Sequence, residues 1–146
     1  MPLILYHRIK KEDVTNNSNC YFIYSENEKK EGGKVYMRQA TNCLPLTISK
    51  APSFFIEAQW TDQEYEENKI KFNKDVDRIV KYLDRRAIIF LENRFLQEEE
   101  NGPMRMTAPK ILDFIIYSVT NLLKVHQPKH ISPNLRSPRT PYATQN

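Results

Sequence analysis

Glycine, cysteine and histidine are scarce in this sequence. Of its 146 residues, 3 are glycine, 2 are cysteine and 3 are histidine. Ordinary usage of about 7% would supply roughly ten glycines, so the count argues against a mechanism that needs several glycine-rich phosphate loops. Cys20 and Cys43 lie in separate apolar runs, and no CxxC or His/Cys cluster is present. We therefore expect two buried thiols in a reducing interior, with no metal site and no cofactor.

Long apolar runs are also missing. No run of 18 or more apolar residues is present, and the nearest, from Ile111 to Leu123, is interrupted by polar residues such as Asp113. A membrane-spanning helix needs about 20 apolar residues. The apolar run at residues 2–5 is too short for a signal peptide. We expect a soluble, cytoplasmic protein with no membrane partner.

The excess of positive charge belongs to the C-terminal end. The chain has 22 basic and 18 acidic residues, and the four cations from residue 124 onward have no acid among them (Lys124, Lys129, Arg136 and Arg139). The body is therefore neutral, which argues against a basic face for nucleic acid. Four prolines interrupt the same end. We predict a single domain over residues 1–124 and a Pro-rich, basic, flexible and disordered tail over residues 125–146.

Apolar patterning predicts an α/β fold. Four short apolar runs are typical of strands: residues 3–6, 20–24, 44–48 and 87–91. Two of them, CYFIY and AIIFL, are nearly continuous, as in strands buried on both faces of a parallel sheet. A capping box at Thr61 and Glu64 predicts a helix over residues 61–84. The sequence predicts a small, mostly parallel sheet flanked by helices.

A second long helix is predicted after Thr107-Ala108-Pro109. Its apolar residues cover most of its circumference from Ile111 to Leu123. A helix of that kind is either deeply buried or shared with a second subunit. The sequence therefore also allows a homo-oligomer formed through this last helix.

Folds of this class bind ligands beyond the carboxyl ends of their strands, so we looked there for site residues. After the second strand come Asn27, the pair Gly32 and Gly33, and the cations Lys34 and Arg38. Glycine lets the backbone approach a ligand, and the cations suit a phosphate. The alternative is a surface turn with two solvated cations.

Two further segments follow strands. Thr47 ends the third strand with a hydroxyl that suits a ribose or a phosphate, and Asn93 and Arg94 follow the fourth strand. Glu26 and Glu92 could form a carboxylate pair across neighbouring strand ends. His7 is interpreted as structural, and the sequence contains no Gly-x-Ser-x-Gly elbow or Walker loop. We assign no catalytic residue.

The ordered set of these motifs resembles a family of small bacteriophage-carried domains of unknown function with a macro-domain-like α/β fold. The resemblance covers roughly residues 5–116. Its elements are, in order, Tyr6-His7-Arg8, Asn27, Gly32-Gly33, Met37-Arg38, Asn42, the run Thr47-Ile48-Ser49-Lys50-Ala51-Pro52-Ser53, Trp60-Thr61-Asp62, Glu67-Asn68 and Ala108-Pro109. It implies a site for a nucleotide-like small molecule.

The departures from the family pattern bear on activity. Ser25-Glu26-Asn27 stands where the pattern has Gly-Asp-Asn, and Gly32-Gly33-Lys34-Val35 where it has Gly-Gly-Gln-Ala. Met37-Arg38-Gln39 replaces Met-Arg-Gly. The late loop, rich in glycine in the family, begins here with Asn93 and Arg94 and keeps only Gly102. Either side chains such as Arg94 hold the ligand, or the nucleotide site has been lost.

Three functions follow as hypotheses. The first is non-enzymatic binding of a nucleotide-like small molecule of ADP-ribose or cyclic-nucleotide type, through which a viral protein would sequester a host defence signal in the host cytoplasm. The second is a protein-interaction module with a host protein as partner, suggested by the run Phe54-Phe55-Ile56. The third is a hydrolase of ADP-ribose derivatives in which Asn27 or Glu26 orients water. We favour the first over the third, because the second loop has lost most of its glycines.

Overall fold

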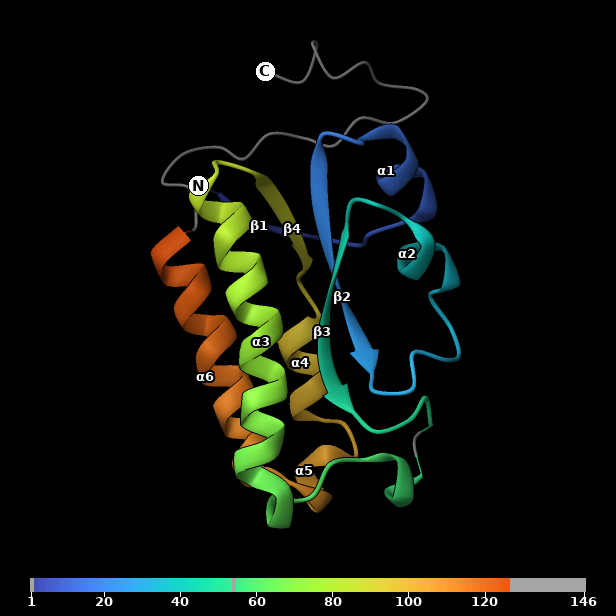
Figure 1. Cartoon of the computed structure of the whole chain (residues 1–146), viewed down its shortest axis with the longest axis vertical. Coiled ribbons are helices and arrows are strands. Elements are labelled where there is room, and N and C mark those ends of the chain that lie inside the picture. The colour runs from blue at the N-terminus through green and yellow to red at the C-terminus, as the bar shows by residue number, and fades with distance from the viewer. Residues whose placement is uncertain (1, 54, 127–146) are drawn as a thin grey trace.

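The computed structural model of the chain describes residues 2–53 and 55–126 (Figure 1). Its centre is a sheet of four strands, all parallel, in the order β1-β4-β2-β3. The strands are β1 (Leu3–Tyr6), β2 (Cys20–Asn27), β3 (Cys43–Ser49) and β4 (Ile88–Glu92). The predicted α/β fold with a parallel sheet flanked by helices is confirmed. Each strand contains most or all of the apolar run that predicted it.

Helices connect the strands and continue beyond the last one. The α-helices are α1 (Lys11–Asn16), α2 (Val35–Gln39), α3 (Tyr65–Asp84), α4 (Phe95–Glu100), α5 (Met104–Thr107) and α6 (Pro109–His126), and the short 3-10 helices are η1 (Ile56–Ala58) and η2 (Asp62–Glu64). Val125 and His126 continue α6, and the rest of the predicted tail lies outside the described residues. Within the described part of the chain, no helix is both long and apolar enough to cross a membrane.

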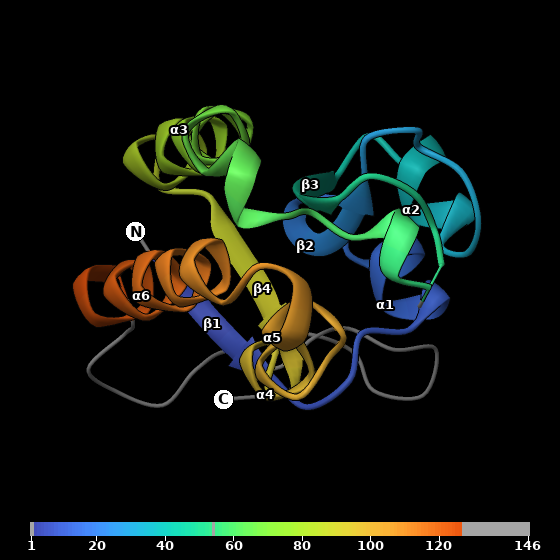
Figure 2. The same cartoon turned by 90° about the horizontal axis from the view of Figure 1, so that it is seen from below.

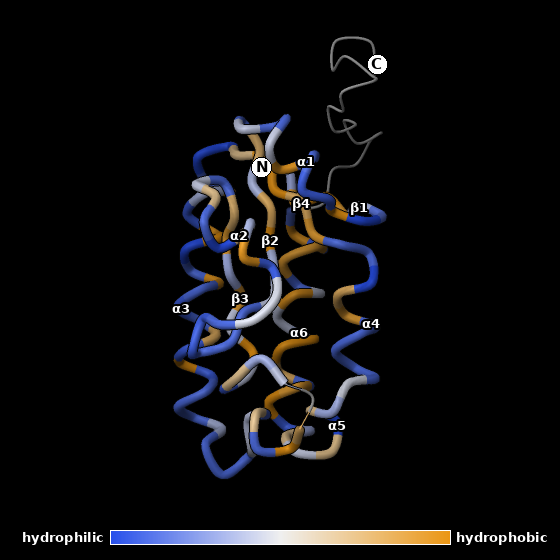
Figure 3. The backbone as a smooth tube through the Cα atoms, turned by 90° about the vertical axis from the view of Figure 1, so that its right-hand side faces the viewer, coloured by the Kyte–Doolittle hydropathy of each residue, from blue (hydrophilic) through white to orange (hydrophobic). Residues whose placement is uncertain are grey.

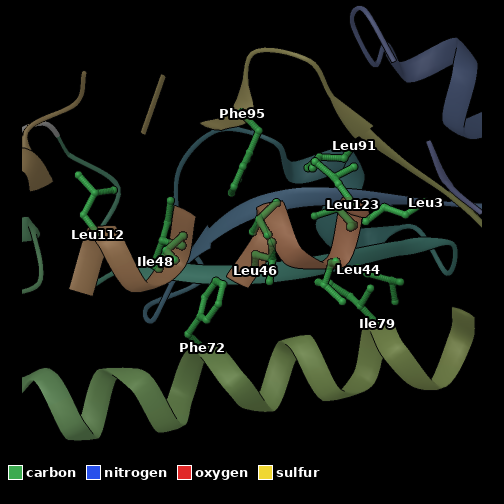
Figure 4. Packing of buried hydrophobic residues seen from close by; sticks show 14 of the residues in the cluster. Leu3, Leu44, Leu46, Ile48, Phe72, Ile79, Leu91, Phe95, Leu112 and Leu123 are labelled. Carbon is green, nitrogen blue, oxygen red and sulfur yellow. The ribbon is translucent and has the colours of Figure 1, made fainter. Parts of the chain in front are cut away.

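Helices cover both faces of the sheet (Figure 2). The larger core lies between the sheet and α3 and α6, and its cluster of buried side chains includes Phe72 and Ile79 of α3, Leu112 of α6 and Leu46 of β3 (Figure 4). The smaller core lies on the opposite face, where Met37 of α2 packs with apolar side chains of β1, β2 and β4. Most of the hydrophobic residues lie in the strands and in α6, whereas α3 is largely hydrophilic (Figure 3). The two inner strands, β2 and β4, are therefore buried on both faces, as their nearly continuous apolar runs predicted, whereas burial alternates along the edge strand β3.

The long central helix begins later than predicted. The α-helical turns start at Tyr65, and residues 62–64 form the 3-10 helix η2, whose N-cap residue Thr61 makes no side-chain cap hydrogen bond. The capping box predicted at Thr61 and Glu64 is therefore wrong, although the helix ends at Asp84 as expected. The reason is a tertiary contact, because Asp62 of η2 forms hydrogen bonds with the first turn of the neighbouring helix α6.

Asp62 of η2 caps the first turn of α6. Its carboxylate accepts the backbone N–H groups of Lys110 at 3.0 Å and Ile111 at 3.1 Å. The first N–H groups of a helix lack acceptors within the helix, and a carboxylate there also interacts favourably with the helix dipole. A residue 48 positions away in sequence thereby fixes the start of the most apolar helix.

Replacing Asp62 with alanine should lower the free energy of unfolding by about 1 kcal/mol, because two amides of α6 lose their acceptor. Urea denaturation followed by circular dichroism measures the change. The neighbouring substitution Gln63→Ala, at an exposed position, is the matched control and should have almost no effect. Equal stability of the two variants would contradict the capping role.

Candidate functional site

The candidate site lies at the carboxyl edge of the sheet, where β2 and β4 part. These neighbours pair only from Cys20 with Ile88 to Phe22 with Phe90, whereas β2 continues beside β3 as far as Asn27 with Ser49. The arrows of β2 and β3 end side by side in Figure 1. The chain leaves β2 toward α2 on one face and leaves β4 toward α6 on the other. Such a topological switch point is where open parallel sheets bind ligands.

Glu26 at the end of β2 holds a buried ion pair. Its side chain is 1% exposed, and Oε2 lies 2.7 Å from Nε of Arg38 on α2. Arg38 donates a second hydrogen bond from NH2 to Oε1 at 2.9 Å, which makes the pair bidentate. The Asn27 amide at 2.9 Å and the Tyr24 hydroxyl at 3.3 Å also donate to this carboxylate. A carboxylate this deeply buried is stable only with such a set of donors.

These contacts set the charge of Glu26. Burial by itself raises the pKa of this carboxyl, but the hydrogen bonds from Arg38 and from the Asn27 amide outweigh it, and the pKa lies below its ordinary value. Burial and the adjacent Glu26 raise the pKa of Tyr24 to about 12. At neutral pH, Glu26 is therefore ionised and the Tyr24 phenol keeps its proton.

Arg38 also organises the β2–α2 loop (residues 28–34). Its guanidinium donates to three successive backbone carbonyls, those of Glu31 at 3.2 Å, Gly32 at 3.3 Å and Gly33 at 3.3 Å. Its charge is neutralised by Glu26, so Arg38 acts mainly as the centre around which the loop is wrapped. The Asn27 side chain holds the same loop through the Glu31 carbonyl at 2.9 Å.

The wrapped loop turns backbone donors outward. In a trans peptide the N–H points opposite to the carbonyl of the same unit, so the amides of Gly32, Gly33 and Lys34 point away from Arg38. Within the described part of the chain these three amides donate to no acceptor. Because the carbonyls converge on Arg38, these amides lie on the convex side of the loop and diverge. They offer separate donors along an extended anion such as a diphosphate and do not close around one phosphate.

Gly32 is required by the geometry of this loop. Its φ is +80°, and a Cβ at this position would lie 2.6 Å from Cβ of Pro52. Lys30 and Lys34 also adopt left-handed φ values, of 55° and 66°. Gly33 differs, since a Cβ there would contact nothing within 4 Å. The loop therefore needs one of its two glycines for its fold and leaves the other open to solvent.

A second anchor ties the loop to the other face of the sheet. Glu28 accepts the indole N–H of Trp60 at 2.8 Å and pairs with Lys71 of α3 at 2.8 Å. Burial raises the pKa of Glu28, but Lys71 and Trp60 lower it more, so the net shift is downward. Trp60 is fully buried. The loop is thus fixed at its start by Glu28 and along its length by Arg38.

The other predicted site residues make separate contacts at the carboxyl ends of the strands. Lys34 extends its amine to the Ser25 hydroxyl at 3.1 Å and is exposed. Thr47, beside Glu26 in the sheet, donates its backbone N–H to Asp75 of α3 at 2.8 Å. Asn93 donates its backbone N–H to the Tyr6 carbonyl at 2.7 Å.

The segment after β4 is helical rather than an open loop. Arg94 pairs with Glu98 one helical turn on, at 3.1 Å, with both side chains more than half exposed. Glu92 lies beside Tyr6 of β1, and Glu26 pairs with Arg38 instead of forming the Glu26–Glu92 carboxylate pair that the sequence allowed. No local signal marks the Glu26–Arg38 partnership, because the two residues are 12 positions apart on different elements.

Two surface hollows lie elsewhere. One of about 340 Å³ is lined by residues of α1, α2 and the segment before β3, and the other, of about 260 Å³, by residues 62–67 and Lys110. Neither includes a predicted site residue. Among the described residues, no group of three or more histidine, cysteine, aspartate or glutamate side chains could hold a metal ion.

The Glu26→Gln variant should lose about 2 kcal/mol of unfolding free energy at pH 7, because Arg38 loses its charged partner. Since the pKa of Glu26 is lower in the folded than in the unfolded protein, its stabilisation is complete above the ordinary glutamate range and is lost as the pH falls. The difference from wild type should therefore shrink toward about pH 3. Urea denaturation at several pH values measures it.

Glu92→Gln is the matched control, since Glu92 lies at the same edge and forms no ion pair among the described residues. It should leave stability nearly unchanged at pH 7. A loss for Glu26→Gln that stays constant down to pH 3 would contradict the ionised, paired state of Glu26.

Comparison with known proteins places the chain in a family. No curated protein and no solved structure gave a significant match. A family model described as "Family of unknown function (DUF7831)" matches residues 4–118. That match runs from the second residue of β1 into α6 and therefore includes β2, β3, β4 and the β2–α2 loop. The chain belongs to this family of unknown function.

Proposed function

We propose that this protein binds a nucleotide-like small molecule through its phosphates at the β2–α2 loop, without catalysis. The observation that carries the proposal is the wrapping of three successive carbonyls around Arg38, which leaves the amides of Gly32, Gly33 and Lys34 facing solvent. Backbone N–H groups that have no acceptor in the protein are available to donate to the oxygens of an anion. The Lys34 amine adds a positive charge at the same loop.

The rigidity of the loop supports this role. Arg38 and Asn27 fix its carbonyl side, and Glu28 fixes its start through Trp60 and Lys71. A donor set that is held in place before binding spends little conformational entropy when the ligand arrives. Its place at a topological switch point agrees with the general position of ligand sites in open parallel sheets.

The nature of the ligand rests on the sequence resemblance. The likeness to phage-carried, macro-like domains points to ADP-ribose or a cyclic nucleotide, and to a viral protein that sequesters a host defence signal. The residues at the edge are already engaged in holding the loop, which favours a binder over a hydrolase. Incubation with ADP-ribose should therefore leave it chemically unchanged, as chromatography would show.

A matched pair of variants tests the role of the outward amides. Gly33→Pro removes one outward N–H, whereas Gly33→Ala keeps it in open space. In isothermal titration with ADP-ribose, Gly33→Pro should weaken binding about tenfold, since a hydrogen bond to a charged group contributes about 1.5–3 kcal/mol. Gly33→Ala should bind as wild type does.

Lys34→Gln is a second variant, which removes a side-chain charge and no backbone N–H. It should weaken ADP-ribose binding, and the loss should be smaller at high salt, where the Lys34 charge is screened. All three variants must keep the wild-type melting temperature for the comparison to hold. Unchanged affinity in both Gly33→Pro and Lys34→Gln, or no heat with ADP-ribose and with a panel of cyclic nucleotides, would refute the proposal.

The pH should modulate this binding through Glu99. Glu99 is a half-buried side chain on α4, and burial is the main reason that its pKa is raised to about 7. Lys34 lowers this pKa, whereas Glu98 raises it further. Above that pH, Glu99 carries a charge that repels an anion and competes for Lys34. Affinity for ADP-ribose should therefore fall as the pH rises from about 6 to about 8.

Glu99→Gln should bind with an affinity that stays flat over this interval. Glu98→Gln is the control, because Glu98 is exposed and paired with Arg94, and it should retain the pH dependence. ADP-ribose is a suitable probe since its diphosphate does not titrate in this range. A fall in affinity that persists in Glu99→Gln would assign the effect to another group.

A further inference from the structure

Exposed apolar side chains lie on the residue that follows the β2–α2 loop and on the segment after β3. Val35 follows Lys34 directly and is 51% exposed, while Phe55 and Ile56 are 76% and 63% exposed. The contact of Gly32 with Pro52 brings the segment after β3 against this loop. Pro52 and Phe55 are three positions apart in the chain, so their Cα atoms lie within about 11 Å of each other. Phe54, part of the same predicted run, lies outside the described residues.

The backbone of Phe55 is held in place. Its N–H donates to the Ser53 hydroxyl at 3.0 Å, and its carbonyl accepts from the Ala58 amide at 3.0 Å and from the Gln59 side chain at 3.4 Å. The Ala58 carbonyl closes the base of the segment after β3, because it accepts hydrogen bonds from the amides of Lys50 at 2.9 Å and Ala51 at 3.2 Å. An aromatic ring that is left in water on such a braced loop is available to a ligand.

We infer that Phe55 stacks on the aromatic base of the ligand whose phosphates bind the outward amides. This inference rests on the proposed function and narrows it, because it requires a base in addition to a phosphate. A flat π-face accepts any base, so the contact would select nucleotides over sugar phosphates without reading the identity of the base. Val35 and Ile56 would extend the apolar floor beneath the ligand.

Titration with two probes separates the inference from the proposed function. ADP-ribose carries a base and a diphosphate, whereas inorganic pyrophosphate carries the diphosphate alone. Phe55→Ala should weaken ADP-ribose binding about tenfold to 100-fold and leave pyrophosphate binding unchanged, and Phe55→Trp should restore the affinity for ADP-ribose. Tyr117→Ala is the matched control, since this aromatic ring on α6 is 71% exposed and should affect neither probe.

The outcomes are distinct. If the wild-type protein binds pyrophosphate as tightly as ADP-ribose, the proposed function stands and the stacking role is overturned. If Phe55→Ala weakens both probes equally, or weakens neither, the stacking role is also overturned, and the exposed Phe55 and Ile56 belong to another partner. If the wild-type protein binds neither probe and none of the cyclic nucleotides, both the inference and the proposed function fail.

Discussion

The ion pair between Glu26 and Arg38 is the interaction on which the candidate site depends. A charge that is 1% exposed at the end of a central strand requires a partner, and the bidentate guanidinium supplies one. The same guanidinium has donors left for three carbonyls of the loop that joins β2 to α2. Satisfying one buried carboxylate therefore fixes the path of a surface loop and turns its amides toward water.

The loop is also tied to the rest of the molecule. Arg38 belongs to the face of the sheet covered by α1 and α2, whereas Glu28 reaches Trp60 and Lys71 on the side of α3. The close approach of Gly32 to Pro52 joins the loop to the segment that carries Phe55. Three connections of different kinds thus converge on seven residues, and together they make a rigid rim at the end of the sheet.

The inner strands β2 and β4 were predictable because their apolar runs are short and nearly continuous, a pattern typical of strands covered on both faces. The start of α3 was not, since the local pattern at Thr61 predicts a cap, whereas Asp62 serves α6 instead. At the site, the sequence located the loop and its glycines. The ion pair that neutralises Arg38 could not be predicted from the sequence, because the contact with Glu26 depends on how β2 and α2 pack and not on spacing along the chain.

The central claim is that the outward amides of the β2–α2 loop receive the ligand's phosphates. Titration of ¹⁵N-labelled protein with ADP-ribose, followed by amide NMR, tests it at the level of single groups. The account predicts large shifts at Gly32, Gly33 and Lys34, with smaller shifts along the segment of Phe55 and none on α6. Shifts confined to the hollow beside α1, or none at any amide, would contradict it.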